Sequence, residues 1–169
     1  MESSKSVTYS EIQYMRHVWW LMLLVFGIAA LMWWGLIQQV IMGAPWGSNP
    51  GPDWFMWLFW LIFGVGFPVA FYLMRMIVEV QDDCVSIRYI PLTKRTIMYS
   101  EIDVVRARTY QPIREYGGWG IRGGSNRNAY NVSGNRGVEL TLIDGRSVMI
   151  GSQKAEELAL AIETKLTRQ

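Results

Sequence analysis

Residues 18–37 read VWWLMLLVFGIAALMWWGLI, and residues 54–74 read WFMWLFWLIFGVGFPVAFYLM. Neither stretch contains a charged side chain. A helix of about 20 residues, rising 1.5 Å per residue, crosses the ~30 Å hydrocarbon core of a bilayer. Two such stretches in a chain of 169 residues predict two transmembrane helices, over residues 18–42 and 54–75. Between them, Gly and Pro residues predict an irregular loop over 43–53.

Charges at the ends of the predicted spans indicate their orientation. Arg16 precedes the first span and Arg75 follows the second, whereas the connecting loop has no Lys or Arg. Positive residues accumulate on the cytoplasmic side of membrane proteins. We therefore expect a multi-pass protein of the cytoplasmic (inner) membrane, with residues 1–17 and the C-terminus in the cytoplasm. Tryptophans near the span ends are expected to anchor them at the headgroup level: Trp19, Trp20, Trp33, Trp34, Trp54, Trp57 and Trp60.

After Arg75 the apolar residues alternate with polar ones, a pattern typical of strands. It predicts strands over 76–81, 85–89, 96–99 and 104–110. Residues 138–142 and 147–150, joined through Asp144-Gly145, predict a β-hairpin. Ser152 is expected to cap a C-terminal helix whose buried face consists of Leu158, Ala161, Ile162 and Leu166. Glu156 and Glu157 near its start, and Lys165 and Arg168 near its end, suit the helix dipole.

Residues 76–169 are expected to form one cytoplasmic domain, and the order of elements over residues 76–166 resembles the bacterial pleckstrin-homology-like (bPH) domains. In many members of this largely uncharacterised family, a membrane hairpin precedes the domain. Four segments carry the resemblance: VEVQDDCVSIR (78–88), YSEI (99–102), VELTLIDGRSVMIGS (138–152) and KAEELALAI (154–162). It implies a PH-like antiparallel sandwich or barrel of about seven strands, capped by the C-terminal helix. The resemblance implies little chemistry, because the family is largely uncharacterised and a fold does not fix a function.

Several kinds of chemistry are excluded by residue types. One cysteine, Cys84, and one histidine, His17, leave no intrachain disulfide and no Cys-based or multi-His metal site. Residues 118–123 read GWGIRG and match the dinucleotide-binding pattern by letter, but no helix or parallel α/β unit follows. We therefore expect no enzyme activity, no cofactor, no nucleotide and no nucleic acid. Without Asp, Glu, Lys or Arg inside the spans, a proton-coupled pump is also not expected.

Positive charge is concentrated in residues 106–136. Six arginines stand there against Glu115 alone, six minus one or +5: Arg106, Arg108, Arg114, Arg122, Arg127 and Arg136. Guanidinium groups bind carboxylates and phosphates in a bidentate way. The segment is a candidate surface for an anionic ligand or partner, or it is a solvated face that keeps the domain soluble. Tyr116, Trp119 and Tyr130, in or beside the glycine-rich part of this segment, are candidate aromatic contacts.

Three functions are compatible with these features. The first is a non-enzymatic, membrane-anchored scaffold that recruits or stabilises a protein partner, including a second copy of itself. The second is a sensor of anionic lipid through residues 106–136. The third is an accessory subunit of a transporter or membrane enzyme, packed through its spans, where Gly64 and Gly66 permit close helix approach or are ordinary membrane composition. Co-purification from native membranes distinguishes the three by what stays bound.

Overall fold

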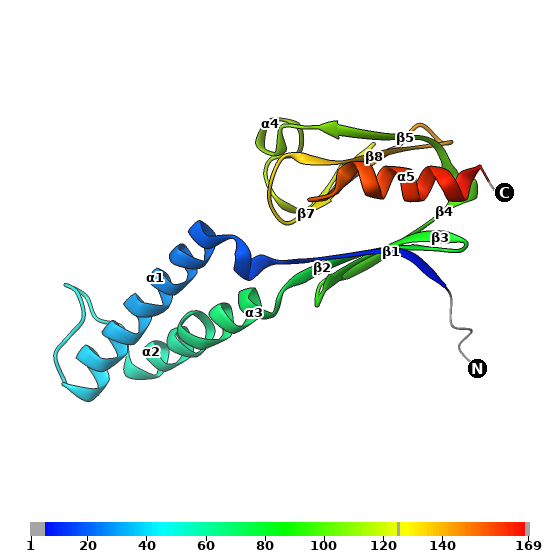
Figure 1. The fold of residues 1–169 in the computed structure, drawn as a ribbon. Coiled ribbons are helices and arrows are strands. Elements are labelled where there is room, and N and C mark those ends of the chain that lie inside the picture. Colours follow the sequence, from blue (N-terminus) through cyan, green and yellow to red (C-terminus); the bar gives the residue numbers. More distant parts are fainter. Residues whose placement is uncertain (1–5, 125, 168–169) are drawn as a thin grey trace. The chain divides into compact units, whose positions relative to one another are not determined.

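The structure is a computed structural model that describes residues 6–124 and 126–167. It consists of two compact units, each described below by itself (Figure 1). One unit runs from Tyr14 to Met74, and the other combines the N-terminal residues up to Gln13 with the chain from Arg75 onward.

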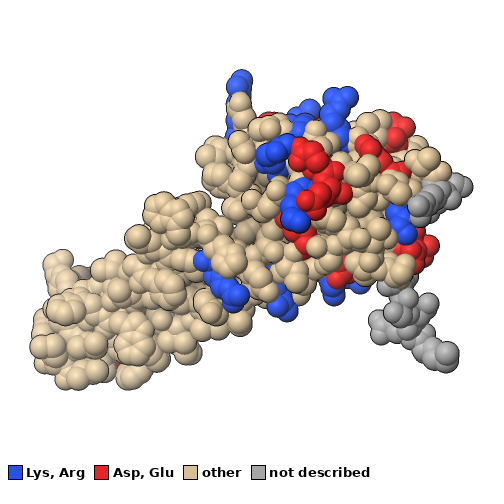
Figure 2. Space-filling view, in the orientation of Figure 1, with Lys and Arg blue, Asp and Glu red and all other residues tan. Residues whose placement is uncertain are grey.

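The first unit is a hairpin of two apolar helices. The first helix is α1 (Trp19–Leu36) with a π-helical end, Ile37–Ile41, and the second joins α2 (Asp53–Phe59), a π-helical stretch, Trp60–Gly66, and α3 (Phe67–Leu73). At 23 and 21 residues, both are long and apolar enough to cross a membrane. Only 28% and 11% of their most apolar windows is buried, unlike the core helix of a soluble protein. Figure 2 accordingly shows the hairpin almost free of charged residues.

The two helices of the hairpin are joined at the ends where the chain enters and leaves them. The backbone N–H of Met15 donates to the carbonyl oxygen of Met74 at 3.0 Å. Beside this bond the Arg16 guanidinium lies 4.3 Å from the ring centroid of Tyr14 and 5.2 Å from that of Tyr72, which are cation–π contacts. Arg16 is therefore held at the same end of the hairpin at which the second helix finishes.

A proline shapes the contact between the two apolar helices. Pro68 has no amide N–H, so it cannot donate to the carbonyl of Gly64 as a residue four positions on normally does. The indole N–H of Trp33 donates to that carbonyl oxygen instead, at 3.3 Å, and the Trp33 ring meets the Trp60 ring edge-on at 5.0 Å. A Cβ atom on Gly64 would lie 2.9 Å from Trp60. These two tryptophans therefore pack between the helices, a role that their interpretation as interface anchors did not include.

The second unit is largely β-structure. Its strands are β1 (Val7–Tyr14), β2 (Arg75–Gln81), β3 (Cys84–Ile90), β4 (Thr93–Met98), β5 (Ile102–Thr109), β6 (Gly120–Gly123), β7 (Arg127–Asn131), β8 (Arg136–Leu142) and β9 (Ser147–Gly151). Its helices are α4 (Pro112–Tyr116) and α5 (Ala155–Leu166). The strands form a four-stranded sheet in the order β1-β2-β3-β4 and a five-stranded sheet in the order β5-β8-β9-β7-β6. The prediction of two apolar helices followed by a β-rich region is thus confirmed.

The number and direction of the strands differ from the prediction. From Arg75 onward the described residues contain eight strands, β2–β9, rather than about seven, and β7 runs parallel to β9, so the sheets are not purely antiparallel. β9 runs opposite to β8, because the two strands form a hairpin, and β7 also runs opposite to β8. β7 pairs with the free side of β9, so these two neighbouring strands are parallel. In addition β1, from the N-terminal segment that precedes the first helix, forms one edge of the four-stranded sheet.

The core lies on one face of the five-stranded sheet, where α5 packs. The alternating residues that face it are buried to 2% exposure or less: Val138, Leu140, Leu142, Val148 and Ile150. From α5, Leu158 and Ile162 are fully buried, as predicted, whereas Ala161 and Leu166 are half-buried and Ala155 and Ala159 complete the buried face. The predicted Arg168 lies outside the described residues.

The start of α5 is held by the N-terminal strand rather than by the predicted cap. The helix begins at Ala155. The Oγ of Ser152 accepts a hydrogen bond from the backbone N–H of Lys154 at 2.9 Å, within the turn that precedes the helix. The Ser152 hydroxyl also donates to a carboxylate oxygen of Glu11, at 2.5 Å, and the N–H of Gln153 donates to the other, at 2.9 Å. The predicted Ser152 cap is therefore wrong as an N-cap, because Lys154 holds that position and Ser152 lies two residues before it.

Candidate binding surface

The register of the five-stranded sheet aligns residues that are distant in the sequence. Arg106 pairs with Glu139, Glu139 with Met149, Met149 with Ala129, and Ala129 with Arg122. Directly paired residues lie on the same face of a sheet. This row therefore crosses all five strands on one face, with an arginine on each edge strand.

Two more arginines lie on the same face, because alternate residues of a strand point the same way. Arg108 follows two positions after Arg106 on β5, and Arg127 precedes Ala129 by two positions on β7. The face is opposite to the one that packs against α5. We call Arg106, Arg108, Arg122 and Arg127 together the arginine face.

Arg108 forms hydrogen bonds within the β-rich unit. Its Nε and one terminal nitrogen donate to Glu139, at 2.8 and 3.2 Å, and the terminal nitrogen also donates to Glu115 at 2.8 Å. The Arg108 side chain is 23% exposed. This hydrogen bond from Arg108 is the main reason why the pKa of the Glu115 carboxyl lies below its ordinary value, and the charge of Arg127 adds to the effect. Arg108 thus joins α4 to the sheet.

The other three arginines of the face are exposed. In the described part of the chain, Arg106, Arg122 and Arg127 form no ion pair. The guanidinium of Arg122 lies against Gly118, 3.1 Å from where a Cβ atom would stand. A guanidinium in water keeps its donors available, so these three groups can donate hydrogen bonds to carboxylate or phosphate oxygens.

The remaining two predicted arginines lie elsewhere. Arg136, at the start of β8, forms an ion pair with Glu156 of α5 and so belongs to the opposite side of the sheet. Arg114 is an exposed residue of α4. The six arginines predicted as one surface therefore divide into four on one face, one on α4 and one bonded to α5.

The predicted aromatic residues have different surroundings. Tyr116 packs against Tyr110, Ala129 and Met149, a small apolar cluster that covers the middle of the arginine-bearing face. Tyr130 pairs with Ile150 on the core side and is 8% exposed, so it contributes to packing.

Asn131 fixes the segments that surround this small cluster. It is completely buried; its Nδ2 donates to the Tyr110 hydroxyl at 2.9 Å, and its Oδ1 accepts the N–H of Gly120 at 2.8 Å. Burial raises the pKa of Tyr110. The tyrosine therefore stays a neutral partner for Asn131.

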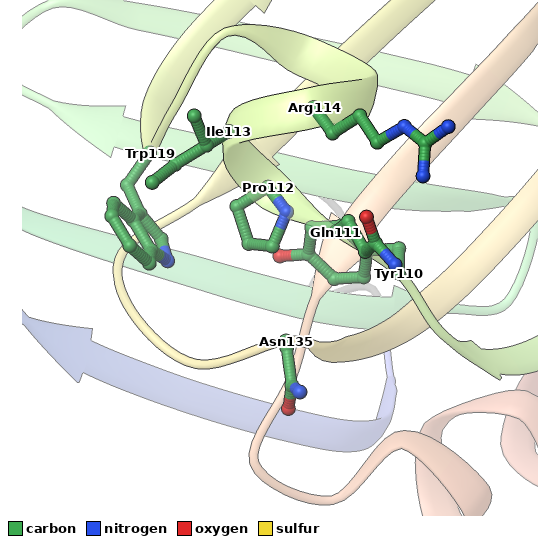
Figure 3. Close-up of a pocket in the computed structure, with 7 residues that line it drawn as sticks. All are labelled: Tyr110, Gln111, Pro112, Ile113, Arg114, Trp119 and Asn135. Atoms are coloured by element: carbon green, nitrogen blue, oxygen red, sulfur yellow. The ribbon is translucent and has the colours of Figure 1, made fainter.

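A small open pocket of about 280 Å³ lies beside α4. Its lining residues are Tyr110, Gln111, Pro112, Ile113, Arg114, Trp119 and Asn135 (Figure 3). Ile113 is 68% exposed, and Trp119 is fixed by its indole N–H, which donates to the carbonyl of Gly134 at 2.8 Å. Figure 3 shows Ile113 next to Trp119 and the Arg114 side chain extending away from Trp119.

Neither α4 nor the pocket beside it was predicted from the sequence, although a signal was present. Pro112 stands at the first helical position, and Gly117, with φ of +74°, ends the helix in the left-handed conformation. Proline at the start and glycine just past the end are a recognised pair of helix boundaries. The helix is only five residues long, too short for apolar periodicity to reveal it.

The described residues contain no group of three or more His, Cys, Asp or Glu side chains placed to hold a metal ion. A comparison with curated proteins finds no match to this chain. A family model, described as a family of unknown function (DUF6141), matches residues 1–168. The match extends over the helical hairpin and the β-rich unit together, and the chain belongs to the DUF6141 family.

Proposed function

We propose that this chain is a non-enzymatic adaptor in which a membrane hairpin anchors a PH-like domain, and in which the arginine face recruits an acidic protein partner at the cytoplasmic membrane surface. The observation that carries the proposal is the row from Arg106 to Arg122, which gives both edges of one sheet face an exposed cation. The PH-like assignment is supported by two sheets followed by a C-terminal helix. An experimental structure that superposes on no PH domain would contradict that assignment.

The membrane anchor is supported by exposed apolar surface. Large side chains such as Leu23, Trp34 and Leu61 are 55–70% exposed along the two helices. Soluble proteins rarely expose apolar patches of this extent to water. The chain leaves the hairpin at Leu73 and enters β2 at Arg75. At no more than about 3.6 Å per residue, this connector keeps the start of the β-rich unit close to the membrane surface.

The proposed topology predicts which positions a membrane-impermeant maleimide reaches in intact cells. Ser48→Cys, in the loop between the spans, is expected to react, whereas Ser100→Cys is expected to react only after the membrane is permeabilised. The native Cys84 is buried and serves as a silent background in both variants. The opposite labelling pattern would place the β-rich unit outside the cell and overturn the cytoplasmic assignment.

An acidic protein is the partner that the surface fits best. Arg106, Arg122 and Arg127 offer guanidinium groups to carboxylates. Between them, the half-buried Tyr116 covers the fully buried Met149 and Ala129, and the exposed Ile113 lines the pocket beside α4. A surface that combines arginine with apolar and aromatic groups is typical of protein interfaces.

The test is co-purification of the full chain from native membranes in mild detergent, followed by mass spectrometry. We expect a protein with an acidic surface to be retained at a stoichiometric level, and the variant Arg122→Glu/Arg127→Glu to retain at least about tenfold less of it. The matched control, Lys94→Glu/Arg95→Glu, reverses the same number of charges on β4 and should retain the partner. Retention of anionic lipid without a protein, or a turnover activity lost in the double variant, would contradict the proposal.

A further inference from the structure

The pocket beside α4 has the character of a receptor for a single apolar side chain. Its walls include the rings of Tyr110, Pro112 and Trp119 and the exposed aliphatic side chain of Ile113. Pockets that enclose a drug-sized molecule measure about 300–1,000 Å³. At about 280 Å³ and open to solvent, this pocket suits one large side chain of a partner better than a whole small-molecule ligand.

The pocket walls are held in place before anything binds. Tyr110 is 1% exposed and accepts the amide N–H of Asn131 through its hydroxyl. The Trp119 indole is bonded to the carbonyl of Gly134, and the backbone N–H of Tyr110 donates to the carbonyl of Asn135 at 2.8 Å. A rigid receptor loses little conformational entropy on binding, which favours affinity.

One arginine lines the pocket and a second lies next to the residue that precedes Trp119. Arg114 lines it and extends away from Trp119 (Figure 3). Arg122 lies against Gly118, the residue that precedes Trp119 in the chain. Glu115, the acidic residue next to Arg114, accepts hydrogen bonds from the Arg108 guanidinium and from the backbone N–H of Gln111. An occupant that carries carboxylates on both sides of its apolar group therefore complements the pocket and its surroundings.

We infer that this pocket receives one large aliphatic or aromatic side chain of a partner protein, presented in a short segment with Asp or Glu on both sides of it. The inference rests on the proposed function and specifies how the acidic partner is recognised. The apolar side chain contacts Ile113 and Trp119, and the flanking carboxylates bond Arg114 and Arg122. A fully desolvated anchor surrounded by polar contacts is the usual arrangement of an interface hot spot.

The probe is a displayed library of random 12-residue peptides, selected on the full chain in nanodiscs of uncharged lipid. We expect the enriched peptides to share one large apolar residue flanked by Asp or Glu. Ile113→Gln should weaken the best synthetic peptide by at least about tenfold, the size of a hot-spot loss. The matched control is Ile143→Gln: Ile143 is 70% exposed against 68% for Ile113, and it lies in the turn after β8. This control should bind within about twofold of the native chain.

Each outcome decides between the two proposals. Peptides without a shared apolar residue, equal binding to Ile113→Gln and the native chain, or no enrichment at all would overturn the pocket inference. If the variant Arg122→Glu/Arg127→Glu nevertheless loses binding of acidic peptides, the proposed function stands without the pocket. If neither change affects binding, both proposals fail.

Discussion

Replacing Gly137 by alanine is expected to destabilise the β-rich unit by about 2–4 kcal/mol, the upper range for forcing a methyl group into a packed site. A Cβ atom at this position would lie 2.4 Å from the carbonyl oxygen of Ile150 and 3.1 Å from the Cα atom of Gly151. Both atoms belong to the backbone of β9, which is paired on both sides and cannot move without breaking sheet hydrogen bonds. Small domains are stable by only about 5–15 kcal/mol, so the change removes a large share.

The measurement uses the buried thiol of Cys84, which is 2% exposed and lies in β3 of the β-rich unit. Its reaction with a thiol reagent during heating of the detergent-solubilised chain reports opening of this unit alone. The midpoint should fall by about 10 °C or more in Gly137→Ala. Gly123→Ala is the control, because a Cβ atom there meets only the Asn128 side chain, at 3.5 Å. Equal midpoints in the two variants would show that β8 and β9 adjust to the methyl group.

The sequence predicted those elements whose signal is local. Twenty uncharged residues specify an apolar helix whatever surrounds them, and the two apolar helices begin and end within one or two residues of the predicted ranges. The β-hairpin of β8 and β9 was found because alternation and the Asp144-Gly145 turn act on the same short segment. The parallel pairing of β7 with β9 has no such signal, since it depends on which side of the hairpin remains free.

The N-terminal strand was missed for a related reason. Residues 7–14 read VTYSEIQY, a segment that mixes polar residues with β-branched and aromatic ones, but it stands before the first apolar helix and 61 positions from β2. Pairing between two strands that a helical hairpin separates in the chain is indicated only by a long-range contact. The hydrogen bonds from Ser152 and Gln153 to Glu11 are part of that contact and belong to no motif.

For the candidate surface, the sequence predicted the concentration of arginine but not its division. Net charge counts Arg108 and Arg136 like the others, yet these two are held by Glu139, Glu115 and Glu156. Whether an arginine is exposed or bonded depends on the register of its strand. A shift of one residue would move every side chain of the strand to the other face of the sheet. The exposed part of the surface is therefore smaller than the composition of residues 106–136 suggests.

Replacing Asn131 by alanine is expected to destabilise the β-rich unit by about 2–4 kcal/mol and to disorder the pocket as well. The substitution removes the donor to the Tyr110 hydroxyl and the acceptor of the Gly120 N–H, and it leaves both groups without a partner. A buried polar group without a partner costs about 1–3 kcal/mol. The same thermal thiol reaction of Cys84 measures the loss, and Asn128→Ala, a half-buried asparagine of the same strand, should change the midpoint little.

A second variant separates the role of Asn131 in stability from its role in the pocket. Tyr110→Phe removes only the hydroxyl that Asn131 bonds, so it should cost less than Asn131→Ala, and the double variant should cost less than the sum of the two. A coupling energy of about 0.5–3 kcal/mol is typical of two groups in one hydrogen-bond network. Because Asn131 holds Gly120, the neighbour of Trp119, Asn131→Ala should weaken the selected acidic peptides more than Tyr110→Phe does at a temperature where both variants are folded. Additive energies together with unchanged peptide binding would mean that Tyr110 and Trp119 keep their places without Asn131, and that the pocket is held by the bonds to Gly134 and Asn135 alone.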